Sequence, residues 1–149
     1  MLSKKAKYGL KALLYLADRP EEKPVLIAEI AEGERIPKKF LDMILLELRN
    51  AGLLFSRKGK GGGYSLALPP ERIVIGTVIR LLDGPLAPVS CVSKSAYRPC
   101  DDCLSETACR IRRLMGRVRD AMADVLDATT LADIRLSAEV REFVLQYDI

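Results

Sequence analysis

The stretch that decides the fold runs from residue 37 to residue 68 and reads PKKFLDMILLELRNAGLLFSRKGKGGGYSLAL. Its first part predicts a helix that Pro37 opens and Gly52 ends, because proline is favoured in a first helical turn and glycine after a last one. Apolar residues recur in this helix at intervals of three and four, which predicts one face packed against a core. These positions are Leu41, Ile44, Leu45 and Leu48.

The second part of the stretch predicts a β-hairpin with strands over 53–56 and 64–68. Apolar residues alternate in the second strand, as in a half-buried strand. The tip between the strands contains only cations and glycines, which are Arg57, Lys58, Gly59, Lys60, Gly61, Gly62 and Gly63. Glycine lets a backbone approach a partner closely and adopt positive φ. A nucleotide-binding loop would continue with Lys-Ser or Lys-Thr and a helix, whereas Tyr64 opens a strand, so we discount such a loop.

Two helices are predicted before this stretch, over 4–18 and 25–32, and Gly33 is expected to close the second. The second helix is expected to bury Leu26, Ile27, Ile30 and Ala31. A short helix, a tight turn and a helix with basic residues at its start have helix-turn-helix geometry. A hairpin directly after such a pair is typical of a wing. With one more helix ending near Leu82, residues 1–84 are predicted to form a winged helix-turn-helix DNA-binding domain.

Residues 85–105 are predicted to form a loop that contains Pro and Cys, and 106–128 to form the longest helix. Its apolar positions keep helical spacing over about five turns and are Ile111, Leu114, Met115, Val118, Met122, Val125 and Leu126. The small domain before it leaves too little chain to bury this stripe. We therefore expect 106–149, with a last helix over 137–146, to form a homodimer; the alternative is that the helix folds back on its own domain. The fold class is mainly α with a small β-hairpin wing.

The absence of histidine and the distribution of charge limit the functions that this chain can have. The 149 residues include no histidine, which excludes Ser-His-Asp and Cys-His catalytic pairs within the chain and imidazole metal ligands, and we expect no enzyme. The net charge is +4, and residues 35–60 carry 7 Lys and Arg against 2 Asp and Glu. A local excess of this kind favours a polyanionic partner, here double-stranded DNA. The alternatives are a solvated charged face and a dimeric adaptor that binds no DNA.

The chain start has no signal-peptide pattern, and no apolar run approaches the ~18–20 residues of a membrane span. A cytoplasmic protein with no membrane association is expected. Its four cysteines all lie within 91–109, with the spacing Cys91-x8-Cys100-x2-Cys103-x5-Cys109. Cytoplasmic cysteines are normally reduced, so metal ligation or redox sensing is favoured over structural disulfides. Four thiolates suffice for an iron–sulfur cluster or for tetrahedral zinc.

Several runs resemble the Rrf2 family of bacterial transcription regulators. They are the predicted recognition helix over 36–53, the wing over 56–66, the opening segment over 5–13 and the segment over 129–133. The resemblance covers nearly the whole chain. It implies a dimeric winged-helix regulator, expected to act as a repressor, whose recognition helix enters the major groove while the wing reaches the minor groove.

The resemblance also implies DNA-binding residues. Lys38 and Lys39 stand where the family's helix N-terminus meets DNA, and Asp42 stands at an acidic position that helps to read bases. Many relatives carry Glu there. The wing cations would contact phosphate or the minor groove, which gives affinity without sequence information. The expected DNA-binding set is Lys38, Lys39, Asp42, Arg57, Lys58, Gly59, Lys60, Gly61, Gly62, Gly63 and Tyr64.

For the cysteines, the resemblance implies a sensor loop. In a subset of the family three cysteines of this loop hold a [2Fe–2S] or [4Fe–4S] cluster, and the Cys103-x5-Cys109 spacing is similar to that subset. Some relatives add a His three residues after the last Cys, where this chain has Arg112. The expected ligands are Cys91, Cys100, Cys103 and Cys109, for an iron–sulfur cluster. Zinc, a thiol–disulfide switch, and cysteines without metal beside another effector are the alternatives.

Overall fold

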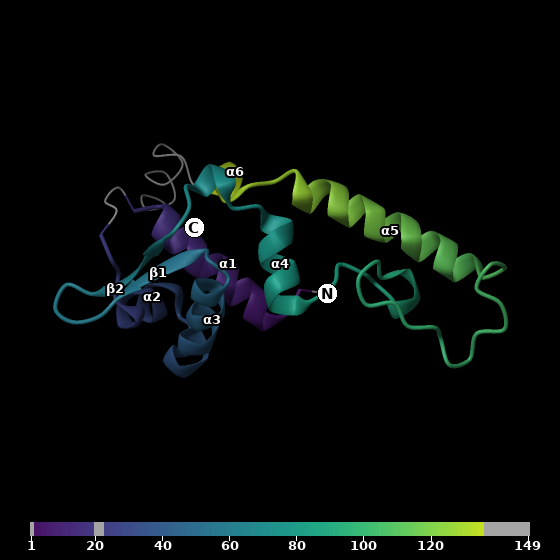
Figure 1. The fold of residues 1–149 in the computed structure, drawn as a ribbon, viewed down its shortest axis with the longest axis horizontal. Helices are drawn as coiled ribbons and strands as arrows, with labels where there is room; N and C mark the ends of the chain where they lie inside the picture. The colour runs from purple at the N-terminus through teal and green to yellow at the C-terminus, as the bar shows by residue number, and fades with distance from the viewer. Residues whose placement is uncertain (1, 20–22, 136–149) are drawn as a thin grey trace.

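A computed structural model describes residues 2–19 and 23–135 of the chain. Helices dominate it, with a single two-stranded antiparallel hairpin in the described part (Figure 1). The fold class predicted from the sequence is therefore confirmed. The elements are α1 (Lys4–Ala17), α2 (Ile27–Glu34), α3 (Lys38–Asn50), β1 (Leu54–Arg57), β2 (Gly63–Leu66), the 3-10 turn η1 (Pro70–Arg72), α4 (Ile75–Asp83), the 3-10 turn η2 (Ser90–Val92), α5 (Arg110–Asp127) and α6 (Leu131–Ile134).

The hydrophobic core lies where α1, α3 and α4 meet. All four apolar positions predicted for α3 are fully buried there, so the helical periodicity gave the right face. Leu13 of α1 and Val78 of α4 are equally inaccessible. Each large aliphatic side chain buried in this way contributes on the order of 1.5–3 kcal/mol. This core fixes the position of α3 relative to the rest of the domain.

The second helix differs from its prediction. It runs over Ile27–Glu34 and continues through Gly33, and Arg35 ends it with a left-handed φ of 55°. Gly33 faces the Tyr15 ring: a Cβ placed on Gly33 would lie 2.8 Å from Tyr15 Cε2. The glycine therefore serves helix–helix packing rather than helix termination. Leu26, expected to be buried, precedes the helix and is 60% exposed.

The wing is a short hairpin in which Leu54 pairs with Leu66 and Arg57 with Gly63. Its second strand has another backbone partner on its far side. The Val25 N–H donates to the Tyr64 carbonyl and the Tyr64 N–H donates to the Val25 carbonyl, both at 2.8 Å. The segment before α2 therefore pairs with the base of the wing, so the wing is tied to the first half of the helix-turn-helix.

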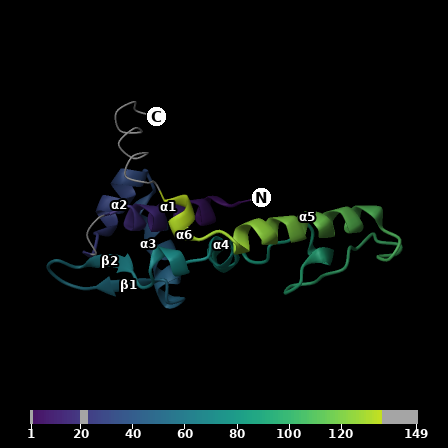
Figure 2. The ribbon, with the colours of Figure 1, turned by 90° about the horizontal axis from the view of Figure 1, so that it is seen from above.

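The long helix α5 extends away from the core in two perpendicular views (Figures 1 and 2). It begins at Arg110 rather than at residue 106, because the preceding residues form turns and Cys109 is its N-cap. None of its residues is buried, and it contacts α4 and η2. After it the chain returns to the core: Leu131 of α6 is fully buried, and its N–H donates to the Ile73 carbonyl at 2.8 Å. The helix predicted over 137–146 lies outside the described residues.

Candidate nucleic-acid interface and cysteine loop

The first turn of α3 is an exposed, positively charged helix start. Lys38 and Lys39 are exposed in this turn, which contains no acidic residue, and Asp42 is exposed in the turn that follows. Pro37 precedes the helix without a side-chain cap, so no side chain occupies the first free N–H groups. Such groups and the positive end of the helix dipole attract phosphate. This helix start has the chemistry of a contact with a nucleic-acid backbone.

Contacts on both sides hold α3 in its orientation. Lys5 Nζ of α1 forms an ion pair with Glu47 Oε1 at 2.7 Å. At the other end, Arg49 Nη1 donates to Ser56 Oγ of β1 at 3.2 Å, which links α3 to the wing. The sequence analysis did not identify Arg49 in this role, since the pairing depends on how the hairpin folds back. The helix and wing are thereby held as one unit.

The exposed face of α3 also carries apolar side chains that the sequence analysis left unassigned. Met43 is 45% exposed and Leu46 is 43% exposed, on the side of the helix away from its buried stripe. Apolar side chains on a recognition helix can contact thymine methyl groups in the major groove.

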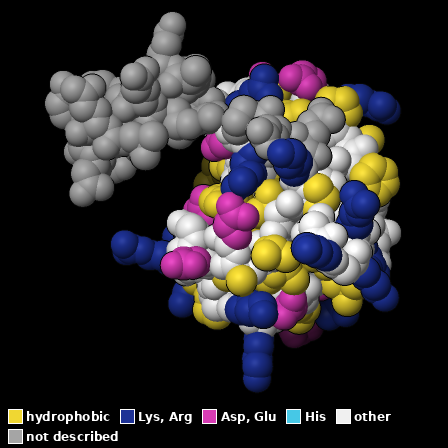
Figure 3. Space-filling model, turned by 90° about the vertical axis from the view of Figure 1, so that its left-hand side faces the viewer, with side chains coloured by type: hydrophobic (Ala, Val, Ile, Leu, Met, Phe, Trp, Pro, Cys, Tyr) yellow, Lys and Arg dark blue, Asp and Glu magenta, His cyan; other side chains and the backbone are white. Residues whose placement is uncertain are grey.

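The wing tip presents its charges to solvent. Arg57, Lys58 and Lys60 are exposed, and Lys and Arg side chains project around this end of the molecule (Figure 3). Within residues 2–19 and 23–135, none of these three cations pairs with a carboxylate. Their charge is therefore available to a polyanion. The five cations predicted at the helix start and the wing are all accessible.

Two of the predicted glycines have structural reasons of their own. A Cβ on Gly62 would clash with the Arg57 carbonyl oxygen across the hairpin, and Gly62 is buried. Gly63 has φ of 140° and lies against the Val25 backbone, where a Cβ would clash with that carbonyl oxygen. Gly59 and Gly61 lie at the exposed tip. The last member of the set, Tyr64, is half-buried and packs against the core, so its side chain supports the wing from below.

The four cysteines occupy different environments. Cys91 lies in η2 and is 7% exposed, Cys100 is exposed, and Cys103 and Cys109 are partly exposed. The Cys109 sulfur accepts the Arg112 N–H at 3.3 Å, so the thiol caps α5. The helix predicted over 106–128 would have placed Cys109 in its first turn, whereas the structure makes Cys109 the N-cap. The positive end of the helix dipole still faces its sulfur.

Arginines of α5 hold the loop by its backbone. Arg112 Nε donates to the Cys91 carbonyl at 3.4 Å, and Arg119 Nη1 donates to the Val92 carbonyl at 2.5 Å. The Tyr97 hydroxyl bonds the Glu106 carboxylate, which raises the pKa of Tyr97 above its usual value. Arg112 stands where some relatives were expected to carry a histidine ligand. In this chain that position fastens the loop to the helix.

The arrangement of the cysteines does not fit a metal ion as it stands. In the described part of the chain, no three Cys, Asp or Glu side chains converge on a point that could hold a metal. Desolvation first, and then the charges of Cys91, Asp102, Cys103 and Cys109, raise the pKa of the Cys100 thiol. In the described structure the loop therefore carries four separate free thiols rather than a formed ligand set.

A bidentate ion pair joins α5 to the DNA-binding side. Arg80 of α4 bonds both carboxylate oxygens of Asp127, at 2.6 and 2.9 Å. The hydrogen bonds from Arg80 hold the pKa of Asp127 below its usual value. Next to the pair, the Ile75 N–H donates to the Thr129 carbonyl at 2.9 Å. The end of α5 is thus fastened to α4, and the cysteine loop to its beginning.

Comparisons with known proteins agree with this architecture. A family model named Rrf2 and described as an iron-dependent transcriptional regulator matches residues 2–135. An rrf2-like HTH-type transcriptional regulator of Rhodobacter capsulatus is 47% identical, over 90% of this chain and 91% of its own length. The HTH-type regulator IscR of Vibrio parahaemolyticus is 32% identical, over 99% of this chain and 84% of its own.

A solved structure shows the same fold. CymR, described as the global cysteine regulator of Bacillus subtilis, superimposes with a TM-score of 0.73 at 36% identity, covering 90% of this chain and 95% of its own. The relatives named here, and CymR of Bacillus subtilis among the similar sequences, are HTH-type transcriptional regulators. Among the described helices, none is long and apolar enough to cross a bilayer.

Proposed function

The chain belongs to the Rrf2 family of DNA-binding transcriptional regulators, and from that premise we propose that it binds an operator as a homodimer, as a repressor in the cytoplasm. The α3 start and Asp42 would enter the major groove and the β1–β2 wing the minor groove. The observation that carries this assignment is the accessibility of five cations on two elements held together by Arg49 and the Val25–Tyr64 pairing. Phosphate contacts by these cations would supply most of the affinity.

A matched pair of triple variants tests the wing. Replacing Arg57, Lys58 and Lys60 by Ala should abolish the shift of the protein's own upstream DNA at moderate salt. Replacing Arg110, Arg113 and Arg117 by Ala removes the same charge from α5, at the far end of the molecule (Figure 1). That control should retain operator binding. Equal loss in both variants would show that net charge alone governs binding, and unchanged binding of the first would refute the wing assignment.

We propose that α5 forms the dimer contact. Its exposed apolar residues Ile111, Leu114 and Val125 are 69%, 51% and 64% accessible and share one side of the helix. Two-fold proteins match two-fold DNA sites. Sedimentation of the intact protein should give twice the mass of the chain, and a monomer at micromolar concentration would exclude this arrangement.

We propose that the cysteine loop is the sensor of redox, iron or sulfur status. Its attachment to the start of α5 supports this: Cys109 caps the helix, while Arg112 holds the Cys91 backbone. Binding of an iron–sulfur cluster or of zinc by the four cysteines remains a prediction. In the described structure no three ligands converge, so the loop would have to rearrange to bind either one. Thiol modification requires no rearrangement of the exposed Cys100.

The sensor is tested by comparing operator affinity before and after oxidant treatment and after anaerobic reconstitution with iron and sulfide. The natural chain should respond to one of these treatments. A variant with Cys100, Cys103 and Cys109 replaced by Ser should respond to neither. An equal response of both proteins would remove the cysteine loop from the mechanism, and a coloured, iron- and sulfide-containing natural protein would identify the cluster. Failure of a gel shift under every condition would favour the adaptor alternative.

A further inference from the structure

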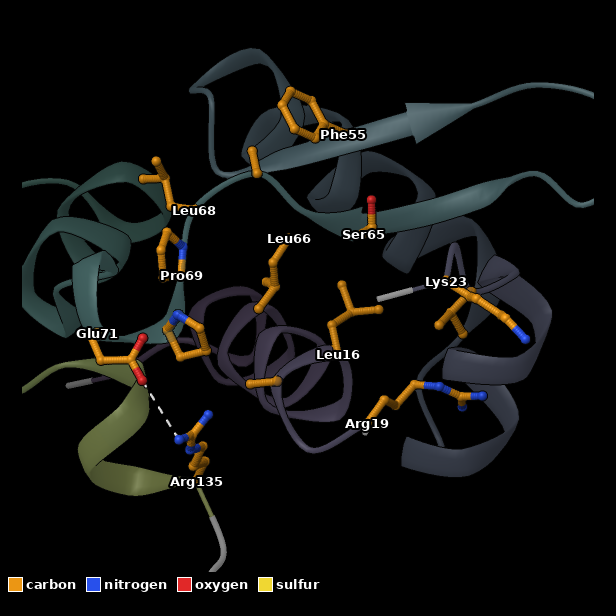
Figure 4. A pocket seen from close by; sticks show the side chains of 14 residues that line it. Leu16, Arg19, Lys23, Phe55, Ser65, Leu66, Leu68, Pro69, Glu71 and Arg135 are labelled. Carbon is orange, nitrogen blue, oxygen red and sulfur yellow. Dashed lines mark ion pairs between the residues drawn. The ribbon is translucent and has the colours of Figure 1, made fainter. Parts of the chain in front are cut away.

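A pocket lies between α1 and the two strands of the wing, away from the α3 start and the cysteine loop. Its volume is about 660 Å³, within the ~300–1,000 Å³ typical of pockets that bind a ligand or side chains. Leu16 of α1 and Leu66 of β2 face each other at its centre, and Phe55 of β1 and Leu68 lie at its edge (Figure 4). Phe55 is 64% exposed, so a large aromatic face at this pocket has no apolar cover among the described residues.

The rim of this pocket is positively charged. It includes Arg19, Lys23 and Arg135, with Glu71 as the one carboxylate of its described lining. Arg135 Nη2 lies 3.6 Å from Glu71 Oε1, and Arg19 pairs with Glu29 at 2.6 Å. An apolar floor with a cationic rim suits an amphipathic segment that carries negative charge.

Such a segment follows directly in the chain. Arg135 lines the pocket, and residues 136–149, which lie outside the described part, continue from it. In this sequence Leu136, Val140, Phe143, Val144 and Tyr147 recur at helical spacing. Three acidic residues against one arginine give the segment a net charge of −2. The apolar spacing of this segment therefore suits the apolar floor of the pocket, and its negative charge suits the cationic rim.

We propose that residues 136–149 dock in this pocket through that apolar stripe, within the same chain. Because the segment starts at the pocket's edge, only a short connection is needed, and short connections carry a small entropic cost of closure. A helix over these residues would be about 21 Å long, enough to pass over the whole pocket. Docking would cover Phe55 and bring acidic side chains to the cationic rim.

The consequence concerns the wing. Phe55, Ser65 and Leu66 belong to its two strands, so a segment seated against them braces the base of the hairpin whose tip carries Arg57, Lys58 and Lys60. A braced wing loses less conformational freedom when it binds DNA. The docked segment is therefore expected to strengthen operator binding without itself contacting DNA.

Photo-crosslinking in the full chain tests the contact directly. With p-benzoylphenylalanine in place of Phe143, irradiation should join the segment to peptides that contain Leu16, Phe55 or Leu66 of the same chain. The same group in place of Ala138, on the opposite side of the expected helix, should not reach them. Cross-links that produce a covalent dimer would assign the pocket to a second copy, and cross-links elsewhere would leave it to a small ligand. Either result overturns the proposal.

Operator affinity supplies a separate readout. Phe143→Asp should weaken operator binding about fivefold, in the range of ordinary coupling between sites, whereas Ala138→Asp introduces the same charge on the other face and should change it little. Equal effects of the two variants would overturn the bracing role. Because the cross-link is measured without DNA, failure of the wing assignment and failure of docking are distinguishable.

Discussion

The head (residues 2–19 and 23–84 with α6) and the arm (residues 85–128) are stabilised by different means. The head has a closed hydrophobic core in which side chains such as Leu13, Ile44 and Leu131 are inaccessible. In the arm, only Cys91, Val92 and Ser93 are buried, and α5 buries none of its residues. Polar contacts from Arg80, Arg112 and Arg119 hold the arm, together with Leu86 and Leu126, which are partly buried against the core.

This difference indicates which region depends on a partner. A core whose side chains are fully buried is complete within one chain, whereas Ile111, Leu114 and Val125 of α5, which are 51–69% exposed, are suited to a second apolar surface that covers them. The head should therefore tolerate changes in the surroundings of the protein, and the arm should respond to them.

The largest expected effect is in the core of the head. Ile44→Ala should lower the free energy of unfolding by about 2–5 kcal/mol, since it leaves a cavity among fully buried side chains. Urea unfolding followed by circular dichroism measures the loss. Leu46→Ala in the same helix removes apolar atoms from a 43% exposed position and should change the free energy by no more than about 0.5 kcal/mol. Similar losses would contradict the division of α3 into a buried and an open face.

Replacing glycine by alanine should destabilise the protein in the head and stabilise it in the arm. Gly63→Ala places a Cβ against the Val25 carbonyl at a φ of 140° and should destabilise the wing by about 1–3 kcal/mol. Gly116→Ala in α5 meets only Val92 Cγ1 at 4.0 Å and should stabilise that helix by about 0.5–1 kcal/mol through helix propensity. Thermal unfolding of both variants checks the contrast, and a stable Gly63 variant with normal operator affinity would break it.

The Arg80–Asp127 ion pair, which joins the head to the arm, should be lost at low pH. Because Arg80 lowers the pKa of Asp127 in the folded protein, the ion pair contributes fully above the ordinary Asp value of 3.8 and is lost as pH falls through the lowered pKa. The NMR shift of the Ile75 amide, which bonds the Thr129 carbonyl beside the pair, reports this loss. Asp127→Asn should remove the acid transition of that signal, and an unchanged transition would assign it to another carboxylate.

The smallest effect on the folded chain should come from the α5 stripe. Leu114→Asp changes a half-exposed position and should leave the fold of the head intact. If α5 is the dimer contact, the melting temperature of the natural protein rises with protein concentration, and that of the variant does not. Leu26→Asp makes the same change at a 60% exposed position of the head; it is the control and should keep the concentration dependence.

Sequence periodicity predicted the head well because its helices bury one face each. The α3 stripe of Leu41, Ile44, Leu45 and Leu48 is fully buried as expected. The error at α2 has a tertiary cause: Gly33 looked like a terminator, yet its missing side chain makes room for Tyr15 of α1. A contact between residues 18 positions apart leaves no mark in local spacing.

The candidate site was predicted in part. The exposure of Lys38, Lys39 and the wing cations followed from composition, since such residues are costly to bury. The cysteine spacing gave the right loop but not its geometry, because a segment without periodic structure follows no repeat that sequence reasoning can extend. Arg112, noted only as a missing histidine, holds the Cys91 carbonyl through a contact visible only in three dimensions.

The fastening of α5 at both ends makes it a lever arm. Its 18 residues span about 27 Å at 1.5 Å per residue, from the Cys109 thiol to the Thr129 carbonyl that bonds the head. A displacement of about 2 Å at the cysteine end therefore corresponds to a rotation of roughly 4° about the head end. In the proposed dimer, that rotation would change the distance between the two heads, which would have to match half-sites about 34 Å apart. The angle between α5 and the head would then control DNA binding, although α5 itself would not contact DNA.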